Sequence, residues 1–512
     1  MFVKVNAATV QGVNATMIGV ECNLTGSTKY TLVGLPDNAV KESLERIFSA
    51  IKHNGIPFPR RMCVINLSPA DIRKEGSAYD LPIAIGILAA NELINNDLID
   101  KFIFMGELSL DGSLKPIRGA LPIAILAREL GFKGFILPKE NACEAAVVND
   151  LDVYGVDNLK NVVEFLSGKI KLEKTEINTR DVFFANINKF DIDFSDVKGQ
   201  EGVKRALEVA AAGGHNLIMI GPPGAGKSMM AKRLPSILPP LTLRETLETT
   251  KIHSVAGKIN GGYSLISQRP FRSPHHTISD VALVGGGTFP QPGEISLSHN
   301  GVLFLDELPE FKRTVLEVMR QPLEDRKITI SRAKFTTEYP ASFMLVASMN
   351  PCPCGYYNHP EKPCVCSSGT VQRYLSKISG PLLDRIDMHI EIVPVPFEKL
   401  SEIKNSESSY HIRQRVIAAR QIQQKRFEEY DGVHCNAQMS SKMLQKYAYL
   451  NPECQNLLKI AMQRMNFSAR AYDRILKVAR TIADLDQSEQ IETSHIAEAI
   501  NYRNLDREGW AG

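Results

Sequence analysis

The sequence predicts a mixed α/β fold of three units, in which a central parallel sheet carries a phosphate-binding loop and a helical unit follows it along the chain. Three observations lead to this prediction. Short β-type runs alternate with helical stretches early in the chain, apolar runs end in glycine-rich or acidic residues in the middle, and the end is almost entirely helix-forming. At 512 residues with a hydrophobic fraction of 44%, the chain is long enough for several buried cores.

The first unit is expected to span residues 1–168. Residues 63–67 and 102–105 have the composition of short strands. Residues 38–54 and 117–130 have the apolar spacing of helices. Together these segments predict a compact α/β unit.

A linker and a second unit follow. Residues 169–193 are charged, rich in asparagine and weakly periodic, which is typical of a linker. The second unit is expected over residues 194–394. Its apolar runs lie at 216–220, 301–305 and 343–348, and long helical or irregular stretches separate them. Such continuous apolar runs are typical of a parallel sheet that is buried on both faces.

The third unit, residues 395–512, is predicted to be a small helical domain. Apolar residues recur there at spacings of three and four, as on the buried face of a helix. The expected helices cover residues 401–429, 440–448, 452–465, 469–485 and 493–502.

Composition narrows the class of protein. Lys and Arg total 60 against 57 for Asp and Glu, so the net charge of +3 makes nucleic-acid binding depend on a local patch. The N-terminus lacks the basic start and apolar block of a secretory signal, and the longest apolar run, residues 81–90, is too short to span a bilayer. Nine cysteines do not fit a secreted disulfide framework. We therefore expect a soluble, cytoplasmic protein with no membrane partner.

One segment matches the pattern GxxxxGK(S/T) between an apolar strand and a helix. Its residues are Gly221, Pro222, Pro223, Gly224, Ala225, Gly226, Lys227 and Ser228. The glycines let backbone N–H groups turn inward around phosphates, and the helix adds its positive end. Lys227 is expected to neutralise the β and γ phosphates of ATP, and the Ser228 hydroxyl to ligate magnesium. The alternative is a glycine-rich turn without a ligand.

A second motif weakens that alternative. The apolar run 301–305 ends in Asp306 and Glu307. Asp306 is expected in the magnesium shell, and Glu307 is expected to polarise the water that attacks the γ-phosphate. An apolar run that ends in two acids is common by itself. The two motifs together predict an ATP-hydrolysing site.

Five longer strings carry a resemblance to a known family. They are DVKGQ at 196–200, RSPHHT at 272–277, GVLFLDELP at 301–309, MNPCPCG at 349–355 and GPLLDRID at 380–387. With these strings the chain resembles the AAA+ superfamily and, more closely, the magnesium-chelatase-like ComM/YifB family over nearly its whole length. The resemblance implies a P-loop AAA+ sheet domain, a helical lid, ATP with Mg²⁺ as cofactors, and a homo-oligomeric ring with six subunits as the expected size.

The resemblance also implies three further roles. Asn350 is similar to the sensor-1 residue that orients the attacking water, Arg385 to the arginine finger that reaches a neighbouring subunit's γ-phosphate, and Arg470 to the sensor-2 arginine of the helical domain. The alternatives are a turn asparagine, a surface arginine paired with a neighbouring aspartate, and a solvated helix arginine. An arginine finger stabilises transition-state charge only in an assembled ring.

The first unit resembles the proteolytic domain of Lon, a ribosomal S5 domain 2-like α+β fold, most visibly in residues 105–112 and 131–141. A Lon protease needs a serine nucleophile and a lysine base. Ala78 stands at the serine position and Leu121 at the lysine position, so no acyl-enzyme is expected. Ser77 is one residue away, but no basic partner follows it. The resemblance therefore implies a degenerate domain that serves as a scaffold or binding module.

One segment is a candidate for DNA contact, and a second is expected to face the ring pore or the ATP site. Residues 324–339 are expected to form a hairpin with a turn near Ala333, and related AAA+ helicases line the ring pore with a hairpin at this place. The hairpin carries Arg326, Lys327, Arg332 and Lys334, which could track a phosphate backbone. A solvated charged hairpin is the alternative. Residues 271–299 resemble a second family insertion, which carries Arg272, His275 and His276. We assign no metal-binding role to the two adjacent histidines.

Four cysteines lie close together in the sequence. Cys352, Cys354, Cys364 and Cys366 form two CxC pairs separated by nine residues. Four thiolates on one loop could hold a tetrahedral structural zinc ion. Because CxC is a less usual ligand pairing than CxxC, a reduced loop without metal remains open.

These features favour an ATPase motor that acts on single-stranded or branched DNA. The ComM resemblance implies a helicase that drives branch migration during homologous recombination and natural transformation. ATP-dependent proteolysis and metal insertion of the magnesium-chelatase type are the alternatives. Missing dyad residues oppose the first alternative, and the absence of an integrin-type metal-binding module in the sequence opposes the second.

Overall fold

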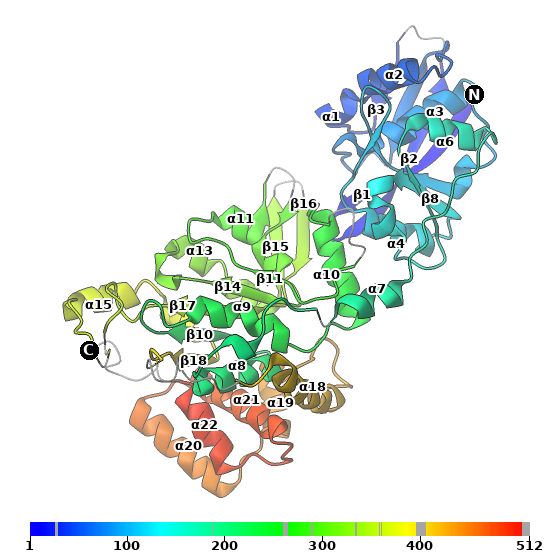
Figure 1. Cartoon of the computed structure of the whole chain (residues 1–512). Coiled ribbons are helices and arrows are strands. Elements are labelled where there is room, and N and C mark those ends of the chain that lie inside the picture. Colours follow the sequence, from blue (N-terminus) through cyan, green and yellow to red (C-terminus); the bar gives the residue numbers. More distant parts are fainter. Residues whose placement is uncertain are drawn as a thin grey trace. The chain divides into compact units, whose positions relative to one another are not determined.

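The computed structural model describes residues 1–25, 29–187, 189–259, 265–287, 290–332, 335–357, 359, 361–395 and 406–503. The chain divides into two compact units, coloured by sequence in Figure 1. One consists of Met1–Asn186 with Leu243–Ser267, and the other of Ile187–Thr242 with Gln268–Gly512. Both are mixed α/β structures.

The N-terminal unit is built on a seven-stranded sheet with the order β3-β4-β2-β1-β5-β8-β9. Its strands are β1 (Phe2–Gln11), β2 (Asn14–Leu24), β3 (Thr31–Val33), β4 (Cys63–Ser68), β5 (Phe102–Phe104), β8 (Gly134–Pro138) and β9 (Asp152–Val156), beside a small pair, β6 (Glu107–Leu108) and β7 (Leu114–Lys115). Its helices include α1 (Asn38–Lys41), α2 (Ser43–His53), α3 (Asp80–Ala90), α4 (Ala120–Glu129), α5 (Lys139–Ala145) and α6 (Leu159–Leu166). The expected helix 38–54 is thus interrupted at Glu42.

Helix α3 explains the longest apolar run of the sequence. Every one of its residues is buried, and it packs against β1 and β2. A helix that is apolar all round needs such a completely buried position. In the part of the chain that the structure describes, no helix has the length and apolar character needed to cross a membrane.

The N-terminal unit also contains a helix from much later in the chain. Helix α10 (Leu243–Val255) packs against α4, and the Gly119 N–H donates to the Ser254 carbonyl over 3.1 Å. Leu265 belongs to the same hydrophobic core. The sequence pattern assigned this segment to the central unit, whereas its contacts place it in the first.

The segment expected to be a linker has structure of its own. Lys174 forms an ion pair with Asp152 at 2.7 Å, and the Thr175 N–H donates to the Val153 carbonyl of β9 over 2.8 Å. Helix α7 (Thr179–Asn186) follows. Residues 169–186 therefore belong to the N-terminal unit.

The second unit is built on a five-stranded parallel sheet with the order β11-β14-β17-β10-β18. The strands are β10 (Leu217–Ile220), β11 (Phe271–Arg272), β14 (Val302–Leu305), β17 (Met344–Met349) and β18 (Met388–Glu391), and all of β10, β14 and β17 is buried. The main helices near the sheet are α8 (Glu201–Gly213), α9 (Lys227–Ile237), α15 (Ser368–Leu375) and α16 (Gly380–Leu383). The three apolar runs of the sequence are thus confirmed as parallel strands.

The C-terminal helices belong to this second unit. They are α18 (Ser409–Arg426), α19 (Ser441–Tyr447), α20 (Pro452–Met465), α21 (Ala469–Leu485) and α22 (Thr493–Asn501). The expected bounds of α20 and α21 are confirmed, while residues 401–405 of the first expected helix lie outside the described residues. Helices α18 and α21 pack on α8 (Figure 1). One hydrophobic core runs from the sheet into these helices.

Candidate functional site

The phosphate-binding loop lies between β10 and α9. Gly224 and Gly226 have φ angles of 79° and 88°, a region that favours glycine. A Cβ atom on Gly221 would lie 2.5 Å from the carbonyl oxygen of Ile392, so this position needs glycine as well. The loop thus has the strand-loop-helix setting that the motif requires.

The Lys227 ammonium lies within this loop. Its Nζ donates to the carbonyl oxygens of Gly221 at 2.7 Å and Pro222 at 2.9 Å, and to Asn350 Oδ1 at 3.0 Å. Burial lowers the pKa of Lys227, while the nearby charge of Asp306 and Glu307 opposes this shift. Phosphate oxygens at the same place would supply stronger, charged acceptors for the ammonium.

The Asp306 carboxylate, which follows β14, accepts hydrogen bonds from the phosphate-binding loop and from β17. The Ser228 hydroxyl donates to Asp306 Oδ2 over 2.6 Å, and the Ser348 hydroxyl donates to Asp306 Oδ1. The two predicted magnesium ligands are therefore adjacent. Sequence reasoning did not identify Ser348, although its place near the end of β17 was a usable signal.

The strand order brings these groups together. β17 lies between β14 and β10, and all three strands are parallel. Asp306 and Glu307 follow β14, Asn350 follows β17, and the phosphate loop follows β10. The four groups consequently share the carboxyl edge of one sheet, where α/β proteins commonly bind ligands. Glu307 is in the left-handed region with φ of 54°, and its carboxylate lies 3.6 Å from His276 Nδ1.

Arg385 lies at the opposite edge of the same sheet, because it precedes β18. Asn216, which precedes β10, accepts a backbone hydrogen bond from Asp387 and donates one from its side chain to the Arg385 carbonyl. The Arg385 side chain is 10% exposed and contacts Glu324 at 2.5 Å and the Pro381 carbonyl at 2.6 Å. At about 3.3 Å per residue, β10 separates the two edges by roughly 10 Å or more. Arg385 therefore does not reach its own phosphate loop in this arrangement.

Arg470 is found near Arg385. Its Nη1 lies 3.1 Å from Asp384, and one turn later Arg474 lies 2.8 Å from the buried Asp387. A cleft of about 130 Å³ has seven lining residues: Glu324, Asp384, Arg385, Arg470, Asp473, Arg474 and Lys477. Burial acts to raise the pKa of Asp387, but Arg474 and the neighbouring His215 together outweigh it and hold that pKa below its usual range. The predicted finger and sensor-2 arginines thus line one cleft.

The expected hairpin is present as β15 (Lys327–Arg332) and β16 (Phe335–Pro340). Lys327 forms an ion pair with Glu338 across the two strands at 2.9 Å. Arg326 precedes the hairpin, and burial lowers its pKa. Lys334 and the Arg332 side chain lie outside the described residues. The cationic hairpin stays a prediction, since the one described hairpin cation is paired.

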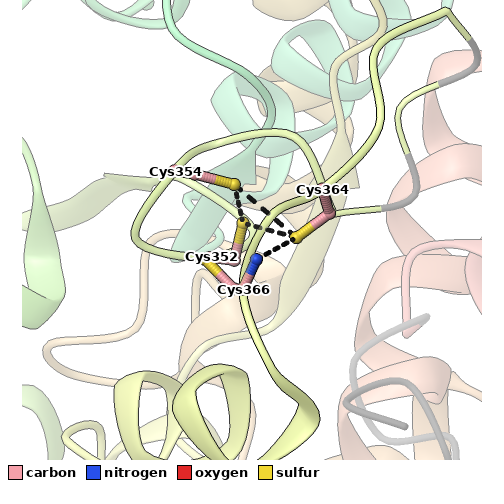
Figure 2. A group of neighbouring side chains, drawn as sticks. All are labelled: Cys352, Cys354, Cys364 and Cys366. Carbon is pink, nitrogen blue, oxygen red and sulfur yellow. Dashed lines mark hydrogen bonds between the residues drawn. The ribbon is translucent and has the colours of Figure 1, made fainter.

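The four predicted cysteines form one cluster (Figure 2). Their Sγ atoms all lie within 4.8 Å of one another, and three of the separations are 3.3, 3.6 and 3.7 Å. A Zn–S bond of about 2.3 Å implies S···S separations of about 3.8 Å in a tetrahedron, whereas a disulfide bond is about 2.05 Å long. The donor set and its spacing fit a tetrahedral metal ion.

The Lon-like positions of the N-terminal unit hold no dyad. Leu121 is fully buried, and the Ser77 hydroxyl donates to the Glu107 carboxylate. Three residues after Ser77, the Asp80 carboxylate accepts two hydrogen bonds from Arg46, at 2.7 and 2.9 Å. The polar groups of this region are thus satisfied by one another.

Three family models match the chain. They are described as magnesium chelatase, subunit ChlI, over residues 193–400; subunit ChlI of Mg-chelatase, over 20–141; and magnesium chelatase, subunit ChlI C-terminal, over 406–503. The chain is 44% identical over 502 residues to competence protein ComM of Haemophilus influenzae, covering 97% of this chain and 96% of that protein. It is 44% identical over 500 residues to YifB of Escherichia coli, covering 97% and 96%. Lon protease 2 of Bacillus subtilis is 30% identical over 159 residues, which are 28% of this chain and 27% of that protein.

Proposed function

The chain belongs to the magnesium-chelatase-like AAA+ family of ComM and YifB, and on this basis we propose that it is an ATP-hydrolysing ring motor that acts on DNA. The motor drives branch migration of recombining strands in homologous recombination and natural transformation. It works as a homohexamer with ATP and Mg²⁺. The name of the ComM relative, a competence protein, supports a role in the uptake of foreign DNA.

One observation carries the motor proposal. The phosphate loop, Asp306, Glu307 and Asn350 lie at the carboxyl edge of the sheet, and Arg385 lies at the amino edge. A ring allows the amino edge of one subunit to complete the carboxyl edge of the next, since heterologous contacts close into rings. In that assembly Arg385 and Arg470 enter the same neighbouring nucleotide site, because they line one cleft.

The test is a branch-migration assay with the full-length protein, ATP, Mg²⁺ and a three-strand or four-way DNA joint. Extension of the joint by the wild type and not by Lys227→Ala or Glu307→Gln protein supports the proposal. Branch migration by these variants at the wild-type rate would contradict the motor proposal. ATPase rates with and without single-stranded and branched DNA test the DNA partner, and stimulation is expected.

Proteolysis and metal insertion are weaker candidates. The hydrogen bond from Ser77 to Glu107 and the burial of Leu121 disfavour a serine protease. Labelling of Ser77 by a serine-directed probe would restore that candidate. Insertion of cobalt or magnesium into a tetrapyrrole by a reconstituted mixture would restore the other.

We also propose that Cys352, Cys354, Cys364 and Cys366 hold a structural zinc ion. Cys352 comes two residues after Asn350, and a Cβ on Gly355, with φ of 83°, would lie 2.4 Å from Pro223 in the phosphate loop. The cysteine loop therefore packs directly on the phosphate loop. Zinc bound there would fix both Asn350 and the nucleotide cradle.

Metal analysis tests the zinc proposal. One zinc ion per chain is expected in purified protein, and Cys364→Ser and Cys366→Ser proteins are expected to lose it. Cys143→Ser is the matched control, because Cys143 lies in the N-terminal unit outside the cluster. Metal-free wild-type protein with an unchanged ATPase rate and unchanged stability would contradict the proposal.

A further inference from the structure

Three aromatic side chains form a row in the N-terminal unit. Tyr30 precedes β3, Phe48 lies on α2, and Phe58 lies in the loop between α2 and β4. The Phe48 ring contacts both others, with centroid distances of 4.9 Å to Tyr30 and 5.5 Å to Phe58. Phe58 is 53% exposed, and the other two rings are partly exposed. The row therefore presents aromatic surface to solvent.

The loop that carries Phe58 has little conformational freedom. Pro57 and Pro59 flank Phe58, which fixes two φ angles and restricts Phe58 itself to extended conformations. Arg61 then anchors the loop, because its N–H donates to Asn91 Oδ1 over 2.9 Å and its carbonyl accepts from Asn91 Nδ2 over 3.2 Å. Asn91 is the C-cap residue of the buried helix α3. The exposed ring is thus held in place before a ligand binds, which reduces the entropic cost of binding.

Charged side chains border the three rings. Four exposed cations adjoin the rings along the chain or one turn further along α2: Lys29, Lys52, Arg60 and Arg61. Lys52 lies four residues after Phe48 and hence on the same face of α2. The exposed Glu45 lies one turn before Phe48. Glu92 is 4.0 Å from Arg61, and both side chains are largely exposed, so solvent screens the pair. The rings are thus bordered by more cations than acids.

Exposed rings beside cations match the chemistry of one class of ligand. Single-stranded nucleic acids are held by base stacking on aromatic rings and by cations along the phosphate backbone. Phe58 offers its ring to a base, and Arg60, two residues later, offers its guanidinium to a phosphate nearby. Arg60 forms no ion pair with any residue in the described part of the chain. A duplex fits less well, because its bases are already stacked on one another.

We propose that the surface made by Tyr30, Phe48, Phe58 and the four exposed cations binds single-stranded DNA on the N-terminal unit. The inference rests on the proposed function for the choice of DNA, since the motor is taken to act on DNA strands. It gives a strand-holding role to a unit whose Lon-like positions hold no dyad. Binding here needs no ATP, because the phosphate loop belongs to the other unit.

The experiment measures the Kd of the full-length protein for a fluorescent oligo(dT) strand, without nucleotide, by anisotropy. Phe58→Leu keeps the apolar bulk and removes the aromatic face, so Kd should rise about five- to tenfold, as when one base no longer stacks. Phe58→Tyr keeps a ring and should bind like the wild type. Phe2→Leu is the matched control, because Phe2 is 62% exposed in the same unit and no ring contact of Phe2 is recorded among the described residues.

A second variant tests the phosphate contact. Arg60→Ala should raise Kd and reduce the slope of log Kd against log salt concentration by about 0.7, the change for one phosphate contact of a single strand. An unchanged slope would show that Arg60 does not contact the backbone and would overturn its part in the surface.

Photocrosslinking locates the bound strand. An oligonucleotide that contains 5-iodouracil should label the tryptic peptide 53–60, which includes Phe58. An unchanged Kd in Phe58→Leu, an equal rise in Phe2→Leu, or no label on this peptide would overturn the proposal. Phe58-dependent binding to anionic phospholipid vesicles, with DNA binding unchanged, would overturn it in favour of a membrane surface. Failure of the wild type to migrate a branched joint, with this binding intact, would count against the motor alone.

Discussion

The two edges of the central sheet carry different sets of side chains although they belong to the same strands. At the carboxyl edge, Lys227, Ser228 and Asp306 hydrogen-bond to neighbouring groups in places where phosphates and Mg²⁺ would compete for them. At the amino edge, Arg385 is held by Glu324 and has no phosphate loop of its own chain within reach. In the proposed ring, one chain would therefore carry two half-sites, and the complete site would need two copies.

The largest expected effect concerns the amino edge. Arg385→Ala should reduce the ATPase rate by about 10³-fold, because an arginine finger stabilises charge that develops only in the transition state. Nucleotide binding should persist, in contrast to Lys227→Ala, which alters the loop itself. Steady-state ATP hydrolysis and binding of a fluorescent ATP analogue distinguish a defect in catalysis at the amino edge from a defect in nucleotide binding at the carboxyl edge. Hydrolysis at the wild-type rate in the assembled Arg385→Ala protein would show that the amino edge has no part in the reaction.

Mixing two inactive variants tests whether the edges combine between subunits. Equal amounts of Glu307→Gln and Arg385→Ala protein should regain about a quarter of the wild-type ATPase rate, since random rings pair an intact base with an intact arginine at roughly one interface in four. Each variant alone is the control. No recovery in mixed rings, with exchange verified by tagged subunits, would place both groups in the same chain's site.

A smaller effect concerns stability at the amino edge. Asp387 accepts hydrogen bonds from Arg474 at 2.8 Å and from the Asn216 N–H at 2.9 Å, and it is 1% exposed. Asp387→Asn should lower the free energy of unfolding by about 2–4 kcal/mol, because it leaves buried partners unpaired.

The matched control for Asp387 is Asp384→Asn. Its partner Arg470 is 64% exposed, so a loss of at most about 1 kcal/mol is expected. Urea denaturation measures both variants. Equal losses would show that burial does not distinguish the two ion pairs.

The smallest effect concerns Glu324, which holds Arg385 within the chain. Glu324→Gln should favour release of the arginine, and so reduce the protein concentration needed for half-maximal ATPase activity by a factor of about two to five. The expected shift is small because the Glu324 side chain is 53% exposed, so solvent screens its ion pair with Arg385. An activity curve against protein concentration gives the answer, and a shift to higher concentration would mean that Glu324 helps assembly.

Much of the carboxyl edge could be predicted from the sequence. A phosphate loop and an acidic strand end are short, local patterns, and the apolar runs marked β10, β14 and β17 to within one or two residues. The contacts of Ser348 with Asp306 and of His276 with Glu307 were not predicted, although Ser348 ends an expected strand and His276 was named in the 271–299 segment. Their partners, Asp306 and Glu307, are distant in sequence, and neither side chain belongs to a periodic pattern.

Contacts between segments that are distant in the sequence also decide where whole helices pack. The buried face of α10 includes Thr246, Thr249 and Thr250, so its apolar periodicity is weak and gave no sign that it packs in the N-terminal unit. The sequence pointed to Arg470, whereas the arginine that pairs with the buried Asp387 is Arg474. Two arginines one helical turn apart differ only in the neighbours that the folded chain supplies.

The position of α10 has a practical consequence. The backbone passes between the two units three times, near Asn186, Thr242 and Ser267. A single protease nick after Asn186 would therefore leave residues 243–267 of the N-terminal unit covalently joined to the second unit, with residues 1–186 held only by non-covalent contacts. A fragment that stops at residue 186 would expose the α4 surface that α10 normally covers, so an excised N-terminal domain should include a grafted copy of residues 243–267.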